Sequence, residues 1–159
     1  AAVNVIKTGN PVALGCIKLG MRKEPFKALH IRLPSGRLLT YFNPSVVLKT
    51  DKYGREKEII AYMGVDSKSK KWSLQYTFGG CLTENVVQAI ARDILCEAML
   101  RLDKAGYNIV FHVHDEIVCE EPIGKRNIKD YEALMAEAPE WAEGLPISVE
   151  VWKGRRYRK

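Results

Sequence analysis

The chain has 159 residues, of which 47% are hydrophobic and 28% charged, with a net charge of +6 and an isoelectric point near 9.1. Its length suits a single domain with one sizeable core, and no apolar run reaches the roughly 18 residues that a membrane-spanning helix requires. Without a recognisable secretion signal or a CxxC pair among the four cysteines, we expect a cytoplasmic protein with no zinc knuckle.

The first half of the chain predicts antiparallel strands after a weakly helical start over residues 1–20. The segment 26–33 alternates apolar and polar residues, as a half-buried strand does. Residues 34–37 have Pro and Gly where a β-turn favours them. Residues 44–58 are predicted to be mainly loop. The predicted strands are 26–33, 38–42, 59–65 and 71–78, the last two joined by a turn at 66–69.

A long amphipathic helix is predicted over about residues 82–104. Gly79-Gly80 would end the sheet region, Thr83 offers an N-cap and Gly106 a C-terminal stop. Apolar residues recur at helical spacing and define one core-facing stripe. The residues of this stripe are Val87, Ile90, Ala91, Ile94, Leu95, Ala98 and Leu102.

Another face of the helix is polar, because Glu84, Gln88 and Arg92 follow one another at i, i+4 spacing. Glutamine can bond base or sugar edges and arginine can hold phosphate, so Gln88 and Arg92 could face nucleic acid. A solvated polar face is the simpler interpretation. The basic clusters at 68–71 and 153–159 leave the same choice between a polyanionic partner and solvated segments.

The most informative segment is the apolar run 107–122, interrupted at its centre by His114, Asp115 and Glu116. Its Val- and Ile-rich arms predict a buried hairpin with a tight turn at His114-Asp115. Carboxylates at such a tip cost desolvation free energy unless they are paired or bind a cation. Mg²⁺ takes one or two protein carboxylates, with phosphates and water completing its shell, which suits phosphoryl or nucleotidyl transfer.

Two other interpretations of this segment stay open. Asp115 could belong to an ordinary polar turn, bonded to nearby backbone amides. Alternatively, His112 and His114 share one face of a strand and could bind zinc, although the pattern HxHxDH is incomplete and His30 is the only other histidine.

The remaining segments predict an amphipathic helix over 127–138 and a last strand over 145–152, before the basic tail. Together the elements predict an α+β fold, in which a mostly antiparallel sheet has a long helix packed on it. No composition shift marks an internal domain boundary, so we expect residues 1–159 to form a single unit.

The series Glu84-Asn85-Val86-Val87-Gln88-Ala89-Ile90-Ala91-Arg92-Asp93, followed by Val113-His114-Asp115-Glu116, resembles the C-terminal palm region of family A DNA polymerases. It is most similar to the phage or prophage members of that family. The segment 113–116 resembles motif C, and 33–37 with Tyr41 and Pro44 resembles the hairpin between the fingers and the palm helix. The resemblance implies that residues 1–80 connect fingers to palm and that 81–159 hold the palm helix, motif C hairpin and C-terminal elements.

This resemblance implies a role for each matching residue. Asp115 would be the metal-ligating catalytic carboxylate and Glu116 an accessory acid near the primer terminus, with His114 contacting the primer end. Gln88 would contact the minor groove of the primer-template. Arg92 replaces a small residue of the family's Gln-Gly-Thr-Ala-Ala-Asp pattern, and we expect it to be a DNA contact, together with Arg37 of the hairpin.

Family A polymerases also carry a second catalytic aspartate in a motif like DYSQIELR, and an Arg/Lys/Tyr helix that binds the incoming dNTP. Neither pattern occurs in these residues. With one of the two carboxylate sets that hold two Mg²⁺ ions, the isolated chain should be inactive. Its expected partners are primer-template DNA, dNTP and the polymerase portion with the other aspartate, in the cytoplasm of a bacterial or phage-infected cell. A non-catalytic DNA-binding remnant and a stand-alone metal-dependent nuclease or phosphatase are the alternatives.

Overall fold

The computed structural model describes residues 1–50 and 52–157, and its fold is α+β, as the sequence predicts. The chain divides into two compact units, Ala1–Ala89 and Ile90–Lys159. The first holds a short helix and a six-stranded antiparallel sheet, and the second holds a two-stranded hairpin with helical segments. The long helix α2 (Gly79–Lys104) contributes residues to both units. None of the helices in the described part of the chain is long and apolar enough to cross a membrane.

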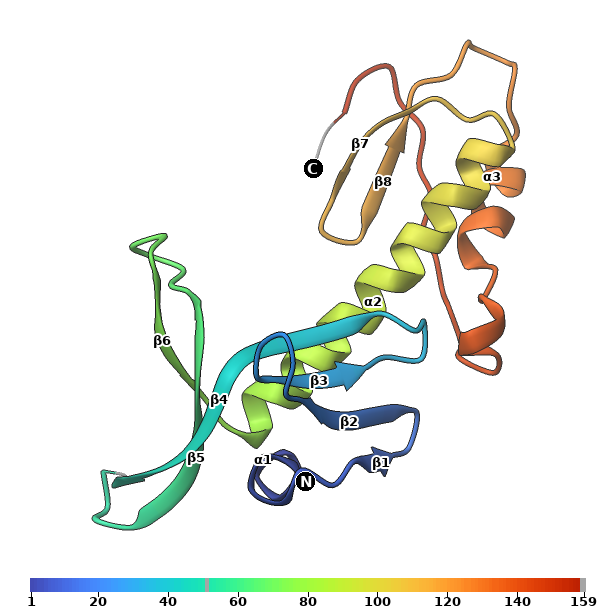
Figure 1. The fold of residues 1–159 in the computed structure, drawn as a ribbon. Helices are drawn as coiled ribbons and strands as arrows, with labels where there is room; N and C mark the ends of the chain where they lie inside the picture. The colour runs from blue at the N-terminus through green and yellow to red at the C-terminus, as the bar shows by residue number, and fades with distance from the viewer. Residues whose placement is uncertain (51, 158–159) are drawn as a thin grey trace. The chain divides into compact units, whose positions relative to one another are not determined.

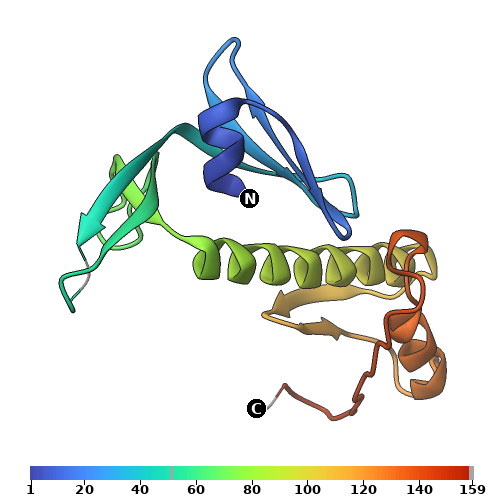
Figure 2. The ribbon, with the colours of Figure 1, turned by 90° about the horizontal axis from the view of Figure 1, so that it is seen from below.

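The sheet of the first unit is a meander, because its six strands pair in chain order and each runs antiparallel to the next. Figure 1 shows that the sheet curls along its length. Helix α1 (Ala2–Thr8) packs against strands of this sheet through the fully buried Val5 (Figure 2). The strands are β1 (Val12–Leu14), β2 (Ile17–Arg22), β3 (Ala28–Arg32), β4 (Leu38–Thr50), β5 (Glu56–Val65) and β6 (Trp72–Thr77).

The prediction of a loop over 44–58 is wrong for most of that range, because β4 continues to Thr50 and β5 begins at Glu56. Asn43 adopts a left-handed φ of +47°, and the pairing of β4 with β5 shifts register between Phe42 and Ser45. Pro44 therefore lies at a β-bulge, one of the places in a sheet that tolerate a residue without an N–H group. Beyond the bulge, the β-branched residues that follow pair normally with β5.

Helix α2 begins at Gly79, three residues before the predicted start, so Gly79-Gly80 opens the helix rather than ending the sheet. The predicted N-cap at Thr83 is wrong, since its hydroxyl lies inside the helix and donates to the Gly79 carbonyl over 3.0 Å. The predicted C-terminal stop is confirmed by Gly106, which has a φ of +75°.

The buried stripe of α2 differs between its two halves. In the first unit Leu82 and Val86 are buried, and in the second unit Leu95, Ala98 and Leu102 are buried. The stripe prediction is wrong for Val87 and Ala91, which are exposed. A single spacing rule misses this because each half of the helix packs within a different unit.

The core of the second unit forms where α2 meets the hairpin of β7 (Ile109–Val113) and β8 (Glu116–Cys119). Helix α3 (Ile128–Ala136) is capped by the Asn127 side chain and packs against the same cluster; the short 3₁₀ helix η1 (Glu140–Ala142) follows it. The buried members of the cluster are Leu95, Ala98, Leu102, Tyr107 and Ile117.

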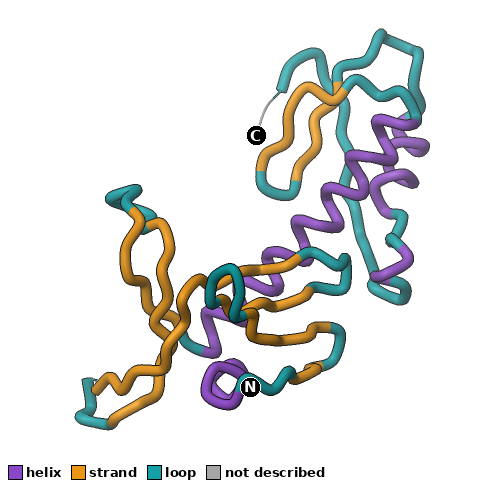
Figure 3. The backbone as a smooth tube through the Cα atoms, viewed as in Figure 1, coloured by secondary structure: helices purple, strands orange, loops and turns teal. Residues whose placement is uncertain are grey.

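Two predictions for this unit are wrong. The hairpin arms are largely exposed, and in β7 and β8, all of whose residues are described, only Ile117 is buried. The segment 145–152 forms no strand (Figure 3). Its period-two pattern is nevertheless real, because Ile147, Val149 and Val151 are half-buried while their neighbours are exposed. Alternation alone does not supply the second strand that a ladder needs.

Candidate catalytic hairpin

The turn between β7 and β8 consists of two residues, because Val113 pairs with Glu116 across it. This confirms the predicted tight turn at His114-Asp115. His114 adopts a φ of +51°, a left-handed conformation that histidine tolerates better than most residues but that still costs free energy. A positive φ at the first residue of a two-residue hairpin turn is what the favoured type I′ and II′ turns require, and glycine, asparagine or aspartate usually supplies it.

Asp115 is exposed at this turn, and its side chain forms no hydrogen bond or ion pair with any residue in 1–50 or 52–157. The alternative of a polar turn, with Asp115 bonded to nearby backbone amides, is therefore not what the described residues form. A carboxylate without these bonds can accept an external cation or donor without first breaking an internal contact.

The next carboxylate along the chain, that of Glu116, is held by Tyr157, which lies in the C-terminal segment after η1. Glu116 accepts a hydrogen bond of 2.8 Å from the Tyr157 hydroxyl. The Tyr157 ring also makes an edge-on contact with Phe111 of β7, with 5.2 Å between centroids. This bond to the Glu116 carboxylate raises the pKa of Tyr157.

Sequence reasoning assigned Tyr157 no contact, because the tail 153–159 stands out by its charge and, over residues 152–158, by a resemblance to the end of phage-type polymerases. Residues 158 and 159 of that tail lie outside the described part of the chain. In the sequence, Tyr157 is an aromatic residue between two arginines, and this pattern does not indicate which residue it would contact. The bond from Tyr157 occupies one oxygen of Glu116, and within residues 1–50 and 52–157 the other oxygen accepts no hydrogen bond.

Helix α2 and strand β7 bring Arg92 and His112 together within the second unit. Each terminal guanidinium nitrogen of Arg92 lies 3.3 Å from one ring nitrogen of His112. A neutral imidazole has one lone pair, so only one of the two contacts can be a hydrogen bond at a time. His112 is thus engaged by a cation. No group of three or more His, Cys, Asp or Glu side chains in the described residues is arranged to hold a metal ion.

The other two sequence-predicted contacts lie in the first unit. The Gln88 amide donates to the Glu84 carboxylate over 3.2 Å, which confirms that these two exposed residues share a helix face. The Arg37 guanidinium donates to the Ala89 carbonyl over 2.8 Å and so ties the turn after β3 to helix α2. Arg37 therefore has a structural contact that its predicted role in DNA binding did not anticipate.

The base of the hairpin is fixed by three polar contacts, of which the bond from Tyr131 is half-buried and the other two are exposed. Glu121 accepts the backbone N–H of Asn108 over 2.8 Å and lies beside Arg126. The Asn108 bond is the main cause of a lowered Glu121 pKa, with the Arg126 charge adding to it. Tyr131 donates its hydroxyl to the Ile117 carbonyl over 2.7 Å. These contacts hold the two arms in register, so that the turn projects from a fixed base.

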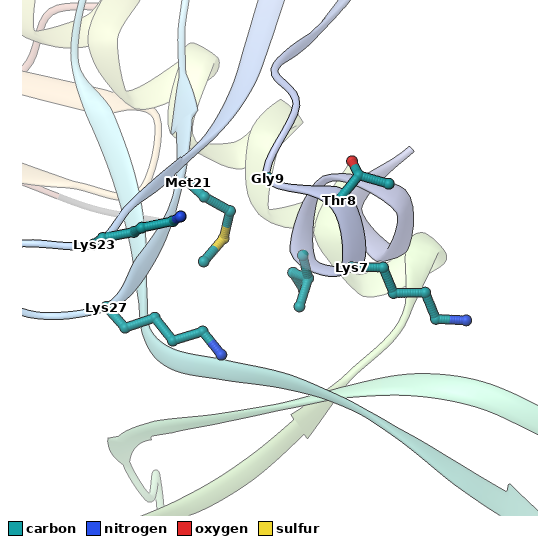
Figure 4. A pocket seen from close by; sticks show the side chains of 7 residues that line it. Lys7, Thr8, Gly9, Met21, Lys23 and Lys27 are labelled. Atoms are coloured by element: carbon teal, nitrogen blue, oxygen red, sulfur yellow. The ribbon is translucent and has the colours of Figure 1, made fainter.

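A separate hollow of about 360 Å³ lies in the first unit, between helix α1 and the strand β2. Its lining includes Lys7, Met21, Lys23 and Lys27, and Figure 4 shows Met21 near the two lysines of the strand region, whereas the Lys7 ammonium points away from them. Lys7 is paired with Glu58. The hollow offers cations but no acid among its lining residues, and it is not part of the acidic hairpin.

The chain is similar to a DNA polymerase of Bacillus phage SP02. The two are 38% identical over 167 residues, which covers 98% of this chain and 25% of that polymerase. The chain thus spans about a quarter of the length of this relative. No family model and no solved structure matches the chain.

Proposed function

We propose that this chain is the C-terminal palm region of a family A DNA polymerase of phage or prophage type. The observation that carries the proposal is the state of Asp115, an exposed carboxylate at a hairpin tip that accepts no hydrogen bond from its own turn. The likeness of the chain to one quarter of a phage DNA polymerase supports the same function.

In this proposal Asp115 is a ligand of the catalytic Mg²⁺ and Glu116 is an accessory acid oriented by Tyr157. The donor set fits that ion, because Mg²⁺ in nucleotide enzymes uses one or two carboxylates and takes its other oxygens from phosphates and water. When bound, the two Mg²⁺ ions would supply charge neutralisation at the reacting phosphate.

The remaining residues position DNA. His114 would contact the primer end, and its left-handed backbone would direct the imidazole away from the strands. Gln88, on an exposed helix face, would reach the minor groove of the primer-template. Arg92 and Arg37 are further proposed DNA contacts, although both also make internal hydrogen bonds.

The proposed reaction is template-directed nucleotidyl transfer. The primer 3′-hydroxyl attacks the α-phosphate of a dNTP, a new phosphodiester bond forms, and pyrophosphate leaves with the electron pair of the broken bond. About three quarters of the similar phage polymerase lies outside the matched region. We propose that the corresponding portion here supplies the second catalytic aspartate and the dNTP-binding helix, so that the isolated chain does not extend primers.

The test is primer extension by the intact polymerase that contains this chain, with Asp115→Ala compared with Glu120→Ala. Glu120 is an exposed acid directly after β8, and its backbone N–H donates to the Asn108 carbonyl. Because metal ligation is worth several kcal/mol in the transition state, Asp115→Ala should slow extension by about a thousand-fold or more. DNA binding, followed by fluorescence anisotropy, should be retained. Glu120→Ala should leave both unchanged.

Three outcomes would contradict the proposal. Extension by the Asp115→Ala enzyme near the wild-type rate would refute the role of Asp115. Nucleotide release by the isolated chain with Mg²⁺ or Mn²⁺ would instead favour a nuclease. Salt-sensitive DNA binding with no gain from Mg²⁺, together with an intact protein that cannot extend primers, would favour a non-catalytic remnant.

A further inference from the structure

The edge strand β6 exposes a continuous row of large apolar side chains. Successive side chains of a strand point to opposite faces, so residues 72, 74 and 76 share one face. Residue 78, directly after the strand, continues the same alternation. These side chains are between 51% and 57% exposed. They are Trp72, Leu74, Tyr76 and Phe78.

The row extends across the sheet as a series of aromatic contacts within the first unit. The Trp72 ring lies 5.6 Å from that of Phe42 on β4, and the Phe42 ring lies 5.2 Å from that of Phe26, measured between centroids. Phe26 is itself 45% exposed. We call the surface formed by Phe26, Phe42, Trp72, Leu74, Tyr76 and Phe78 the aromatic face.

Cations lie on this aromatic face rather than only around it. The Lys49 ammonium is 5.0 Å from the centre of the Tyr76 ring, and the Arg22 guanidinium is 5.3 Å from the centre of the Phe26 ring. The turn that leads into β6 adds Lys68, Lys70 and Lys71, and within the described residues none of their ammonium groups forms an ion pair. Residues 38–78 contain seven Lys and Arg against four Asp and Glu.

An edge strand with such a surface needs a partner, because long apolar edges otherwise pair with other chains. An apolar protein segment would have to bury the ammonium groups that lie on the rings, at a high desolvation cost. A single nucleic-acid strand meets both features at once, because its bases stack on aromatic rings while its phosphates pair with lysine. The combination of exposed aromatic side chains and lysines that form no ion pair within the described residues therefore favours nucleic acid.

We propose that the aromatic face binds single-stranded DNA by stacking bases on Trp72 and Tyr76, with Lys68, Lys70 and Lys71 contacting phosphates. The identification of this strand as the unpaired template rests on the proposed function. The stacking itself does not, since every base has a π-face and the interaction requires no particular sequence.

The test measures binding of a fluorescein-labelled oligothymidylate to the full 159-residue chain by fluorescence anisotropy. Trp72→Ala and Tyr76→Ala should each weaken binding about five-fold or more, because one stacked base is lost. Leu74→Ala removes a comparably exposed side chain from the same row but no π-face, so it should weaken binding less than Trp72→Ala does. Leu48→Ala is the matched control, because it removes an exposed leucine of β4 that is not part of the aromatic face, and it should leave the affinity unchanged. Trp72→Phe, which retains an aromatic ring, should restore most of the binding.

The lysines are tested by the salt dependence of the same binding. Replacing Lys68, Lys70 and Lys71 with glutamine should make the plot of log affinity against log salt shallower, by about 0.7 for each phosphate that is no longer neutralised. Far-ultraviolet circular dichroism checks that each variant retains its sheet. The exposure of Trp72, Leu74 and Tyr76 makes folding insensitive to their replacement.

Several results would overturn the inference. The first is the absence of oligonucleotide binding. The second is an equal loss of affinity from Leu74→Ala and Trp72→Ala, and the third is self-association of the chain through this face. Either of the last two would indicate a protein interface. These failures are distinct from failure of the proposed function, because the Asp115→Ala test on the intact polymerase does not involve the aromatic face. Asp115-dependent extension with no oligonucleotide binding would remove this inference alone.

Discussion

Among the described residues, two hairpins carry an aspartate at the turn, and they use it in opposite ways. In the β5–β6 hairpin, Asp66 accepts the backbone N–H groups of Ser69 over 2.7 Å and of Lys68 over 3.2 Å. These bonds lower the pKa of Asp66. In the β7–β8 hairpin, Asp115 accepts no hydrogen bond from any described residue. The turn that contains it is instead shorter and is closed by a histidine in a left-handed conformation.

The difference separates a structural carboxylate from one that is available for chemistry. Asp66 follows the usual behaviour of aspartate in turns, where its oxygens replace backbone acceptors. Asp115 leaves its oxygens open, and its turn is strained rather than stabilised by the side chain. An aspartate in a turn is therefore no evidence of a metal site by itself. What distinguishes Asp115 is the absence, within the described residues, of the bonds that Asp66 accepts.

The largest predicted effect, on the free energy of unfolding, concerns the buried side chains that attach each hairpin to its core. Ile117 is the only buried side chain of β7 and β8, whereas β5 and β6 bury Ile60, Ala61 and Thr77. Ile117→Ala should lower the free energy of unfolding by about 2–4 kcal/mol, because it removes a core side chain and leaves a cavity. Urea denaturation measures this change. Val110→Ala, at an exposed position of β7, should stay within about 0.5 kcal/mol, and a similar loss at both positions would contradict the single anchor.

The second prediction concerns strain at the acidic turn. His114→Gly should raise the free energy of unfolding by about 0.5–1 kcal/mol, because glycine adopts a left-handed φ without the cost borne by other residues, less its own entropy loss. His114→Ala should give no such gain. If His114 contacts the primer end, both variants should slow extension by the intact polymerase. Thermal unfolding and primer extension measure the two effects separately, and a destabilised glycine variant would show that the turn is not strained.

The local parts of this fold could be predicted from sequence, and the non-local partners could not. The turn at His114-Asp115 and the helix stop at Gly106 depend on neighbouring residues, and both are where the sequence places them. The continuation of β4 past Pro44 depends on a bulge at Asn43, which composition does not reveal. A charged, proline-containing segment therefore looked like a loop.

The candidate site shows the same limit. Asp115 and Glu116 could be singled out because two acids interrupt an apolar run. The partner of Glu116 could not, since Tyr157 lies 41 residues further along the chain. The contact of Arg92 with His112 spans 20 residues and was equally hidden. Spacing rules reach one helical turn or one strand, and tertiary packing decides the rest.

The smallest predicted effect is the loss, at low pH, of one carboxylate hydrogen bond in each of the two hairpins. Asp66 accepts amide N–H groups at the tip of its hairpin, and Glu121 accepts the Asn108 N–H at the base of the other. Both pKa values are lowered from their ordinary values of 3.8 and 4.5. Each carboxylate therefore stabilises the folded chain fully above its ordinary value, and this contribution disappears as the pH falls through the lowered one.

The amide resonances of Ser69 and Asn108, followed by NMR from neutral pH into acid, report each bond directly. Each should shift with a midpoint below the ordinary value of its acceptor, so that acid loosens one hairpin at its tip and the other at its base. Asp66→Asn should abolish the step at Ser69 only, and Glu121→Gln the step at Asn108 only. A midpoint at or above 3.8 for Ser69, or 4.5 for Asn108, would mean that the carboxylate does not prefer the folded state when charged. Asp66 would then no longer be distinguished from Asp115 by the bonds it accepts.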